Sequence, residues 1–160
     1  MSCTKNNFSI KQIYQIKNMK TKDLHSLIQH HIPQIQYLEL ETSESVEAEC
    51  AIWQQDDCTL IIDFENKNLD STQVIAALQN VSRKLAWLDT HRADVLQTIS
   101  TESKLNDTSN TYIQYAAFLI ENADDVFCDF ALAAPQWGEQ TAACSLEEDN
   151  ELIFHGIETN

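Results

Sequence analysis

The sequence predicts an α+β fold with helices packed on one face of a mainly antiparallel sheet. A long helical pattern of apolar residues runs over residues 70–100, and alternating apolar and polar residues occur on both sides of it. Successive strands with short connections pair in antiparallel fashion. Together these patterns give the order α–βββ–αα–βββ, which is typical of helices layered on a sheet.

Length and charge predict one acidic domain preceded by a basic arm. The 160 residues suit a single domain, and a hydrophobic content of 43% is too high for a disordered acidic tail. Residues 1–32 carry five Lys and one Asp, whereas residues 33–160 carry five basic and 24 acidic side chains. We therefore expect a basic N-terminal arm with a short helix over residues 1–33, and a single acidic α+β domain over residues 34–160.

A short helix is predicted between Thr21 and Pro33. Leu24, Leu27 and Ile28 follow helical spacing, with Thr21 as the candidate N-cap and Pro33 as the residue that ends the helix. The residues before Thr21 fit both strand and helix periodicity, so no element is assigned to them.

Three strands are predicted next, over residues 34–41, 46–54 and 58–65. The second and third strands each have one apolar face, which indicates that both faces belong to the same core. A two-residue turn would place these faces on opposite sides of the sheet. We therefore predict a three-residue loop at 55–57.

That loop predicts a specific register between the second and third strands. It places Ile52 opposite Leu60, and Cys50 opposite Ile62. Cys50 and Cys58 would then lie about 13 Å apart along the strands, at about 3.3 Å per residue, which is too far for a disulfide.

The longest helix begins at Asp70, which forms a capping-box pattern with Gln73. Its apolar positions are Val74, Leu78, Val81, Leu85, Leu88, Val95 and Ile99. The helical spacing lacks one apolar residue between Leu88 and Val95, near residues 89–90. The pattern therefore fits either one helix that continues to Ser100 or two helices that meet at this point.

A second helix is predicted over residues 110–121, and three strands complete the fold. In this helix the inward-facing residues would be Tyr112, Tyr115, Ala116 and Leu119. The strands are predicted over residues 126–134, 139–146 and 151–157, because each run alternates and the intervening segments favour turns.

Several classes of function are excluded or disfavoured by residue type and spacing. Two glycines in the whole chain cannot build a phosphate-binding loop of the Walker or dinucleotide type. The spacing of His25, His30 and His31 does not place two imidazoles on one helix face, so we predict no metal site. We likewise expect no cofactor.

We also predict that the protein is not an enzyme. Asp89, His91 and Arg92 could form an acid–base cluster, but a helix cap and a snorkelling arginine explain them better. The five cysteines are odd in number and lack a C-x-x-C pair, which indicates reduced thiols. No segment resembles a signal peptide or a membrane span, so we expect a cytoplasmic protein that does not bind membranes.

The carboxyl-terminal third of the chain carries charge of one sign. After Lys104 there are eleven carboxylates and no Lys or Arg. Such a region repels nucleic acid and anionic lipid, and it attracts basic proteins. The candidate partner-binding residues are seven carboxylates that would steer a basic partner, Asp124, Asp125, Asp129, Glu139, Glu147, Glu148 and Asp149, with Phe127 and Trp137 as aromatic anchors. Trp137 is included because it lies in a predicted turn, where an indole is difficult to bury.

Scattered residues over about residues 46–157 resemble a group of small acidic bacterial domains. The shared features are Trp53, the run Leu60–Phe64, Leu69-Asp70 at the start of the long helix, Leu88-Asp89 with Arg92 at its end, Tyr112 with Tyr115, and Phe154-His155-Gly156. These domains are assigned as immunity proteins of polymorphic toxin systems, including contact-dependent inhibition and type VI secretion. The resemblance implies a non-enzymatic protein that binds one cognate toxin. The carboxyl-terminal hairpin has fewer glycines than is usual in the group.

We therefore expect an immunity-type protein that neutralises a toxin domain with a basic face, such as a nuclease. A nuclease holds a polyanion and so has a basic active face that an acidic protein can occupy. The alternative is an acidic adaptor or nucleic-acid mimic that binds endogenous basic proteins. A third class, an enzyme built on the Asp89 cluster, requires its three side chains to converge in a pocket.

Overall fold

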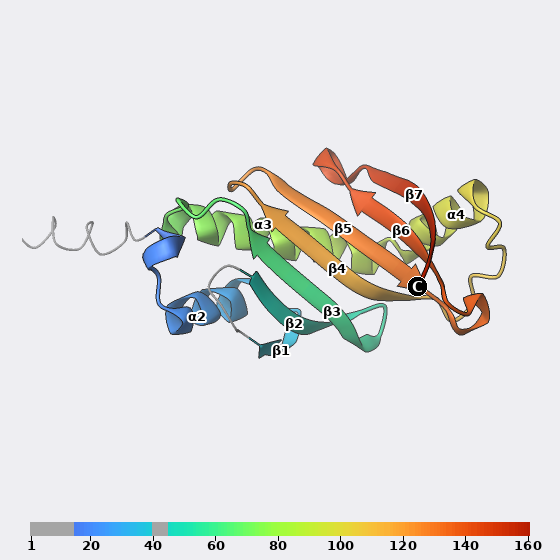
Figure 1. Ribbon diagram of the computed structural model, residues 1–160, viewed down its shortest axis with the longest axis horizontal. Coiled ribbons are helices and arrows are strands. Elements are labelled where there is room, and N and C mark those ends of the chain that lie inside the picture. Colours follow the sequence, from blue (N-terminus) through green and yellow to red (C-terminus); the bar gives the residue numbers. More distant parts are fainter. Residues whose placement is uncertain (1–14, 40–44) are drawn as a thin grey trace, which may run out of the picture.

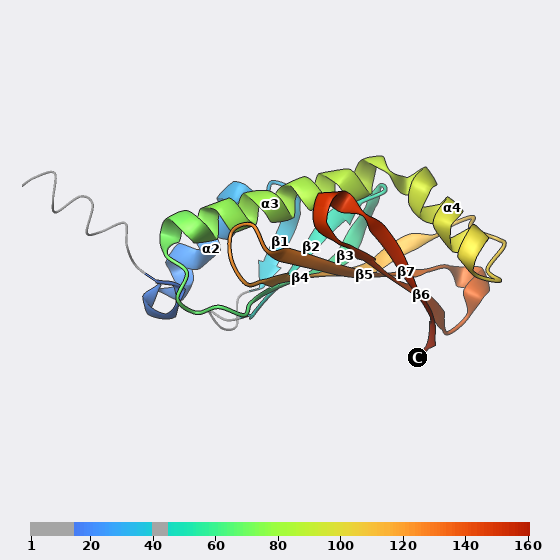
Figure 2. The ribbon, with the colours of Figure 1, turned by 90° about the horizontal axis from the view of Figure 1, so that it is seen from above.

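Seven strands form one sheet, and the α-helices of the described chain lie against one face of it (Figures 1 and 2). The computed structural model describes residues 15–39 and 45–160. The strands are β1 (Ile35–Glu39), β2 (Ser45–Ile52), β3 (Gln55–Phe64), β4 (Tyr112–Ile120), β5 (Val126–Ala133), β6 (Gln140–Leu146) and β7 (Leu152–Thr159). The helices are α2 (Thr21–His31), α3 (Ser71–Thr90) and α4 (Arg92–Glu102), with short 3₁₀ turns η1 (Ile16–Asn18), η2 (Pro135–Trp137) and η3 (Glu148–Asn150). The predicted α+β class is confirmed.

The strands lie in the sheet in the order in which they occur in the chain. Every neighbouring pair is antiparallel except β3 and β4, which run parallel. Parallel neighbours need a long crossover, and α3 and α4 provide it. The predicted late strands are present as β5, β6 and β7, with small shifts at their ends.

Helix α2 confirms the first predicted helix, but its N-cap is Lys20, so the prediction of Thr21 as the N-cap is wrong. Its Leu24 and Ile28 are fully buried in the core that the sheet and α3 share, and Ile16 of η1 is buried there too. The described part of the predicted basic arm therefore packs on the acidic domain. The rest of that arm, residues 1–14, lies outside the described residues.

The long helical pattern consists of two helices. The predicted capping box is present, because Asp70 Oδ1 accepts from the Gln73 amide at 2.9 Å and Gln73 Oε1 accepts from the Asp70 amide at 2.9 Å. At the other end His91 leaves helical geometry, with φ −116° and ψ 31°, and α4 begins at Arg92. The missing apolar position in the sequence pattern therefore coincides with the break between α3 and α4.

The predicted helix over residues 110–121 is wrong, because these residues form β4. The run is apolar at nearly every position, so its pattern fits a buried helix as well as a central strand that packs on both faces. A bulge at Gln114 interrupts the alternation. Beyond it Ala116, Phe118 and Ile120 face α3, and the residues between them face away.

The predicted register between β2 and β3 is also wrong. A two-residue turn at Trp53 and Gln54 joins the strands, and both residues have positive φ, 57° and 66°. Cys50 therefore lies directly opposite Cys58. A bulge between Cys50 and Ile52 keeps both apolar faces in the core despite the short turn.

Hydrogen bonds to residues distant in the sequence stabilise this turn. The Trp53 amide donates to Asp89 Oδ1 at 2.7 Å, and its indole Nε1 donates to the Leu88 carbonyl at 2.7 Å. The end of α3 thus holds Trp53 in a backbone conformation that non-glycine residues rarely adopt. The sequence near the turn carries no sign of these contacts.

Candidate functional site

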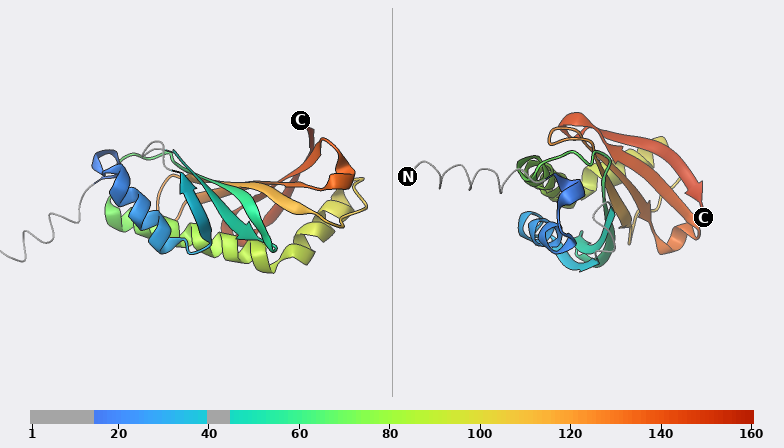
Figure 3. Two further views of the ribbon diagram at one scale, coloured as in Figure 1. Left: turned by 90° about the horizontal axis from the view of Figure 1, so that it is seen from below. Right: turned by 60° about the vertical axis from the view of Figure 1, so that its left-hand side comes forward.

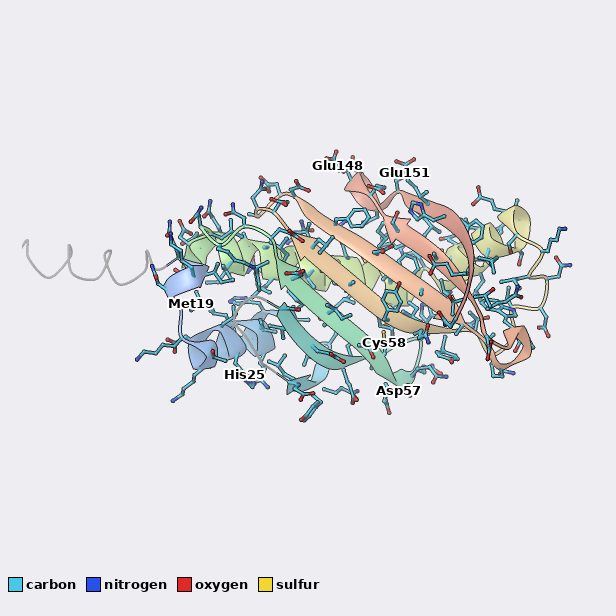
Figure 4. The ribbon with its side chains drawn as sticks, in the orientation of Figure 1. Met19, His25, Asp57, Cys58, Glu148 and Glu151 are labelled. Atoms are coloured by element: carbon cyan, nitrogen blue, oxygen red, sulfur yellow. The ribbon has the colours of Figure 1, made fainter. Side chains whose placement is uncertain are left out.

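Six of the nine predicted partner-binding residues lie around one pocket at an end of the sheet. The β4–β5 and β6–β7 connections bring them together, and the pocket has a volume of about 450 Å³. We call this group the acidic end, and it comprises Asp124, Asp125, Phe127, Glu147, Glu148 and Asp149. Glu148 and the neighbouring Glu151 project into solvent from the β6–β7 connection (Figure 4).

The acidic end also contains two basic residues, which the sequence analysis missed. Arg83 and Lys84 of α3 line the same pocket. Lys84 is 6% exposed, and its ammonium donates to the Glu147 carbonyl at 3.3 Å. Its helical spacing from Val81 and Leu88 places it on the inward side of α3, and this signal was available in the sequence. The negative potential of the acidic end is therefore partly neutralised from within.

Trp137 is not an exposed anchor, and this prediction is wrong. The indole is 7% exposed and packs on the core from η2, with Nε1 donating to the Asp107 carbonyl at 2.8 Å. The connection after α4 folds over the turn, and sequence spacing could not show this contact. Glu139 lies at the end of β6 opposite the acidic end, because Gln140 and Leu146 are the two ends of that strand. The structure therefore does not bring Glu139 and Trp137 together with the other candidates.

Asp129, the ninth candidate, lies on the face of the sheet that no described helix covers (Figure 3). We call this surface the open face. Strand alternation and register assign to it Tyr37, Glu39, Glu47, Glu49, Thr59, Ile61, Asp63, Tyr115, Ala117, Leu119, Phe127, Asp129, Ala131, Thr141, Ala143, Ser145, Ile153, His155 and Glu158. Phe127 belongs to both regions, so the open face is continuous with the acidic end.

The open face has a floor of small residues beneath larger side chains. Ala131 is 1% exposed and Ser145 is 0% exposed, although no described helix lies over them. Side chains from neighbouring strands must therefore cover them. Tyr115 pairs in register with Ala131, and His155 contacts Ser145, so both are among the covering groups.

A hydrogen-bond network crosses this region. Ser145 Oγ lies 2.7 Å from His155 Nε2 and donates to Glu147 Oε1 at 3.1 Å. The tautomer of His155 decides whether Nε2 donates to Oγ or accepts from it. A nucleophilic serine must be open to a substrate, whereas Ser145 is fully buried. The network is therefore a link between the open face and the acidic end.

Negative charge accumulates around Asp129. Burial raises the pKa of the Asp129 carboxyl; His155 lowers it, and the nearby Glu158 and Glu147 raise it. Burial also raises the pKa of Tyr115, with further contributions from Asp129 and Glu158. These carboxylates repel one another in the absence of a cationic partner.

Charge is segregated between the two layers of the protein. The seven strands contain no Lys or Arg, whereas α2, α3 and α4 each contain at least one. Among the described residues, the open face presents Glu39, Glu47, Glu49, Asp63, Asp129 and Glu158, and His155 is the only one of its side chains that can become cationic. This surface favours a cationic protein and disfavours polyanions.

The residues considered for acid–base chemistry have structural contacts. Asp89 accepts from the Trp53 amide, and the Arg92 guanidinium lies 5.5 Å from the Trp53 ring centroid and donates to the Thr111 carbonyl at 3.4 Å. His91 stacks on the Trp87 ring at 4.1 Å. Asp89 and Arg92 line an open pocket of about 730 Å³ whose lining does not include His91. The three side chains do not converge there.

No family model, curated protein or solved structure matches the chain. Within the part of the chain that the structure describes, no helix has the length and apolarity needed to cross a membrane.

Proposed function

We propose that the protein is an immunity-type inhibitor that binds and neutralises a cognate bacterial toxin domain with a basic face. The observation that supports this most strongly is the segregation of charge, since all seven strands lack Lys and Arg. The face of the sheet that no described helix covers consequently carries carboxylates and no Lys or Arg. A protein that needed acidity for solubility alone would gain it equally well from a mixed surface.

A nuclease is the toxin class that this surface fits best. Its substrate is a polyanion, so the face that binds substrate is basic. An acidic inhibitor can occupy that face, and complementary potentials accelerate association by about 10-fold to 1000-fold at low salt. The apolar residues of the open face, such as Ile61 and Leu119, would add affinity that salt does not screen.

The competing proposal is an acidic adaptor or nucleic-acid mimic that binds endogenous basic proteins. Such a protein relies on charge and has many partners of similar, salt-sensitive affinity. The apolar residues at the centre of the open face favour a single matched partner instead, because shape and desolvation discriminate between partners where charge alone does not.

Affinity capture of the tagged protein from its native host, at low and then high salt, distinguishes these proposals. We expect one stoichiometric basic polypeptide that remains bound as the salt concentration rises. Expression of that polypeptide alone should arrest growth, and co-expression of this protein should restore growth. Many basic proteins that dissociate together would favour the adaptor, and a lack of any partner would contradict both proposals.

A further inference from the structure

We propose that the partner docks on the open face, and that the acidic end lies at the periphery of the interface. The occupant is a basic protein that presents an apolar ridge flanked on both sides by Lys or Arg. This inference rests on the proposed function and assigns it a surface and a complementary chemistry.

The centre of the open face is more apolar than a solvated sheet face requires. Antiparallel sheets with one uncovered face usually carry polar residues there. Here Ile61, Leu119 and Ala117 occupy that face on β3 and β4, in the middle of the sheet. All three are only partly exposed, so they form a continuous apolar surface with the adjoining side chains.

Carboxylates border this apolar strip on both sides. One row of register partners runs from Glu47 through Ile61 and Ala117 to Asp129. The two carboxylates are three strand spacings apart, about 14 Å at 4.8 Å per spacing. An element about 10 Å wide, such as one α-helix, fits between them and can place a cation near each.

The charge of this surface disfavours a second copy of the chain, nucleic acid and anionic lipid as occupants. A second copy of the chain would place the carboxylates of two open faces against each other with no Lys or Arg to pair with them. Nucleic acid and anionic lipid are repelled for the same reason. A basic protein is the occupant that both the carboxylates and the apolar strip accept.

The acidic end is the weaker candidate for the centre of the interface. Arg83 and Lys84 lie in its pocket and oppose the entry of another cation. The same pocket holds Asp124 and Asp125, so part of its negative charge is compensated before any partner arrives. The open face carries no such compensating Lys or Arg.

The first test measures the affinity of the captured polypeptide for three variants that each change the net charge by +1. They are Ile61→Lys on the open face, Glu148→Gln at the acidic end and Gln97→Lys on the exposed side of α4. We expect Ile61→Lys to raise the Kd about 100-fold or more, and the other two to change it about threefold or less. Circular dichroism and thermal unfolding establish that each variant is folded.

The outcomes separate the two proposals. A captured partner that binds Ile61→Lys as tightly as wild type, or that loses most affinity with Glu148→Gln, would overturn the docking surface and leave the immunity proposal standing. Failure to capture any partner would overturn both.

The second test needs no partner. We expect removal of five open-face carboxylates to unmask the apolar strip and to cause self-association at about 100 µM, measured by sedimentation velocity. The variant replaces Glu47, Glu49 and Glu158 with Gln, and Asp63 and Asp129 with Asn. The matched control neutralises five exposed carboxylates elsewhere, namely Asp23, Asp94, Glu102, Glu148 and Asp149. Equal sedimentation of the two variants would show that the strip is too polar to dock a partner, which would overturn the inference.

Discussion

On the covered side of β3, Leu60 and Phe64 are fully buried against the helices, whereas Thr59, Ile61 and Asp63 of the same strand face away from them. The covered face shows what folding requires, which is large apolar side chains packed at high density. The open face combines an apolar centre with carboxylates, although no described helix packs against it. Its composition is therefore better explained by a partner than by the core.

The helical layer differs from the open face in charge as well. Arg83 and Arg92 lie on α3 and α4, where both signs of charge are present, as is usual for a solvated surface. The strands hold carboxylates and no Lys or Arg. This difference between neighbouring layers of one small domain is the main support for a binding surface.

The largest expected effect comes from a matched pair of adjacent residues on β4. Phe118 faces α3 and is fully buried, whereas Leu119 is on the open face. Phe118→Ala should lower the free energy of unfolding by about 3–5 kcal/mol, because it leaves a cavity. Leu119→Ala should lower it by about 1 kcal/mol or less and should weaken partner binding. Urea unfolding monitored by circular dichroism measures both, and equal losses would contradict the assignment of the two faces.

A smaller effect is expected at the start of the helical layer. Asp70→Ala removes the acceptor for the Gln73 amide and breaks the capping box. It should lower the free energy of unfolding by about 1 kcal/mol and should leave partner binding unchanged. The same urea experiment measures the loss, with Asp70→Asn as a control that retains a capping side chain. A loss of binding in Asp70→Ala would show that the helical layer takes part in recognition.

The smallest effect concerns pH and Asp129. Because the folded state raises the pKa of this carboxyl above its unfolded value, the ionised group destabilises the fold at neutral pH. The destabilisation is present above the raised pKa and disappears as the pH falls below the unfolded pKa. Asp129→Asn should therefore have a slightly higher Tm than wild type at pH 7, with a difference that shrinks as the pH falls through the raised pKa.

Thermal unfolding of both proteins from about pH 8 to about pH 3 measures this difference. A constant difference across the range would mean that another property of Asn causes it. The corresponding Glu102→Gln variant, at an exposed position on α4, is the control for a single lost carboxylate.

The sequence predicted those features of the fold that local patterns determine. The capping box at Asp70, the three late strands and the layered α+β class all follow from periodicity and helix-start chemistry. The helix predicted over residues 110–121 failed because a nearly uninterrupted apolar run carries no single period. Its true state depends on β3 and β5, which lie on either side of it.

The candidate site was predictable in composition and only partly in position. Charge counting found the acidic residues. Their positions depend on strand register and on long-range contacts, which the sequence did not show. Trp53 and Trp137 show this clearly, because the first stabilises a turn through α3 and the second is buried beneath the connection after α4. The open face was predictable on the second and third strands, whose apolar sides indicate the core, but not on β4, whose residues were predicted to be helical.

Carboxylate footprinting with a water-soluble carbodiimide is the most direct test of whether the partner docks on the open face. The protein is labelled alone and in complex with the captured polypeptide, and modification at each carboxylate is read by mass spectrometry. We predict strong protection of Glu47, Glu49, Asp63 and Glu158 in the complex and unchanged labelling of Asp94 on α4. Protection at Asp94, or at the acidic end without protection of the open face, would contradict the account.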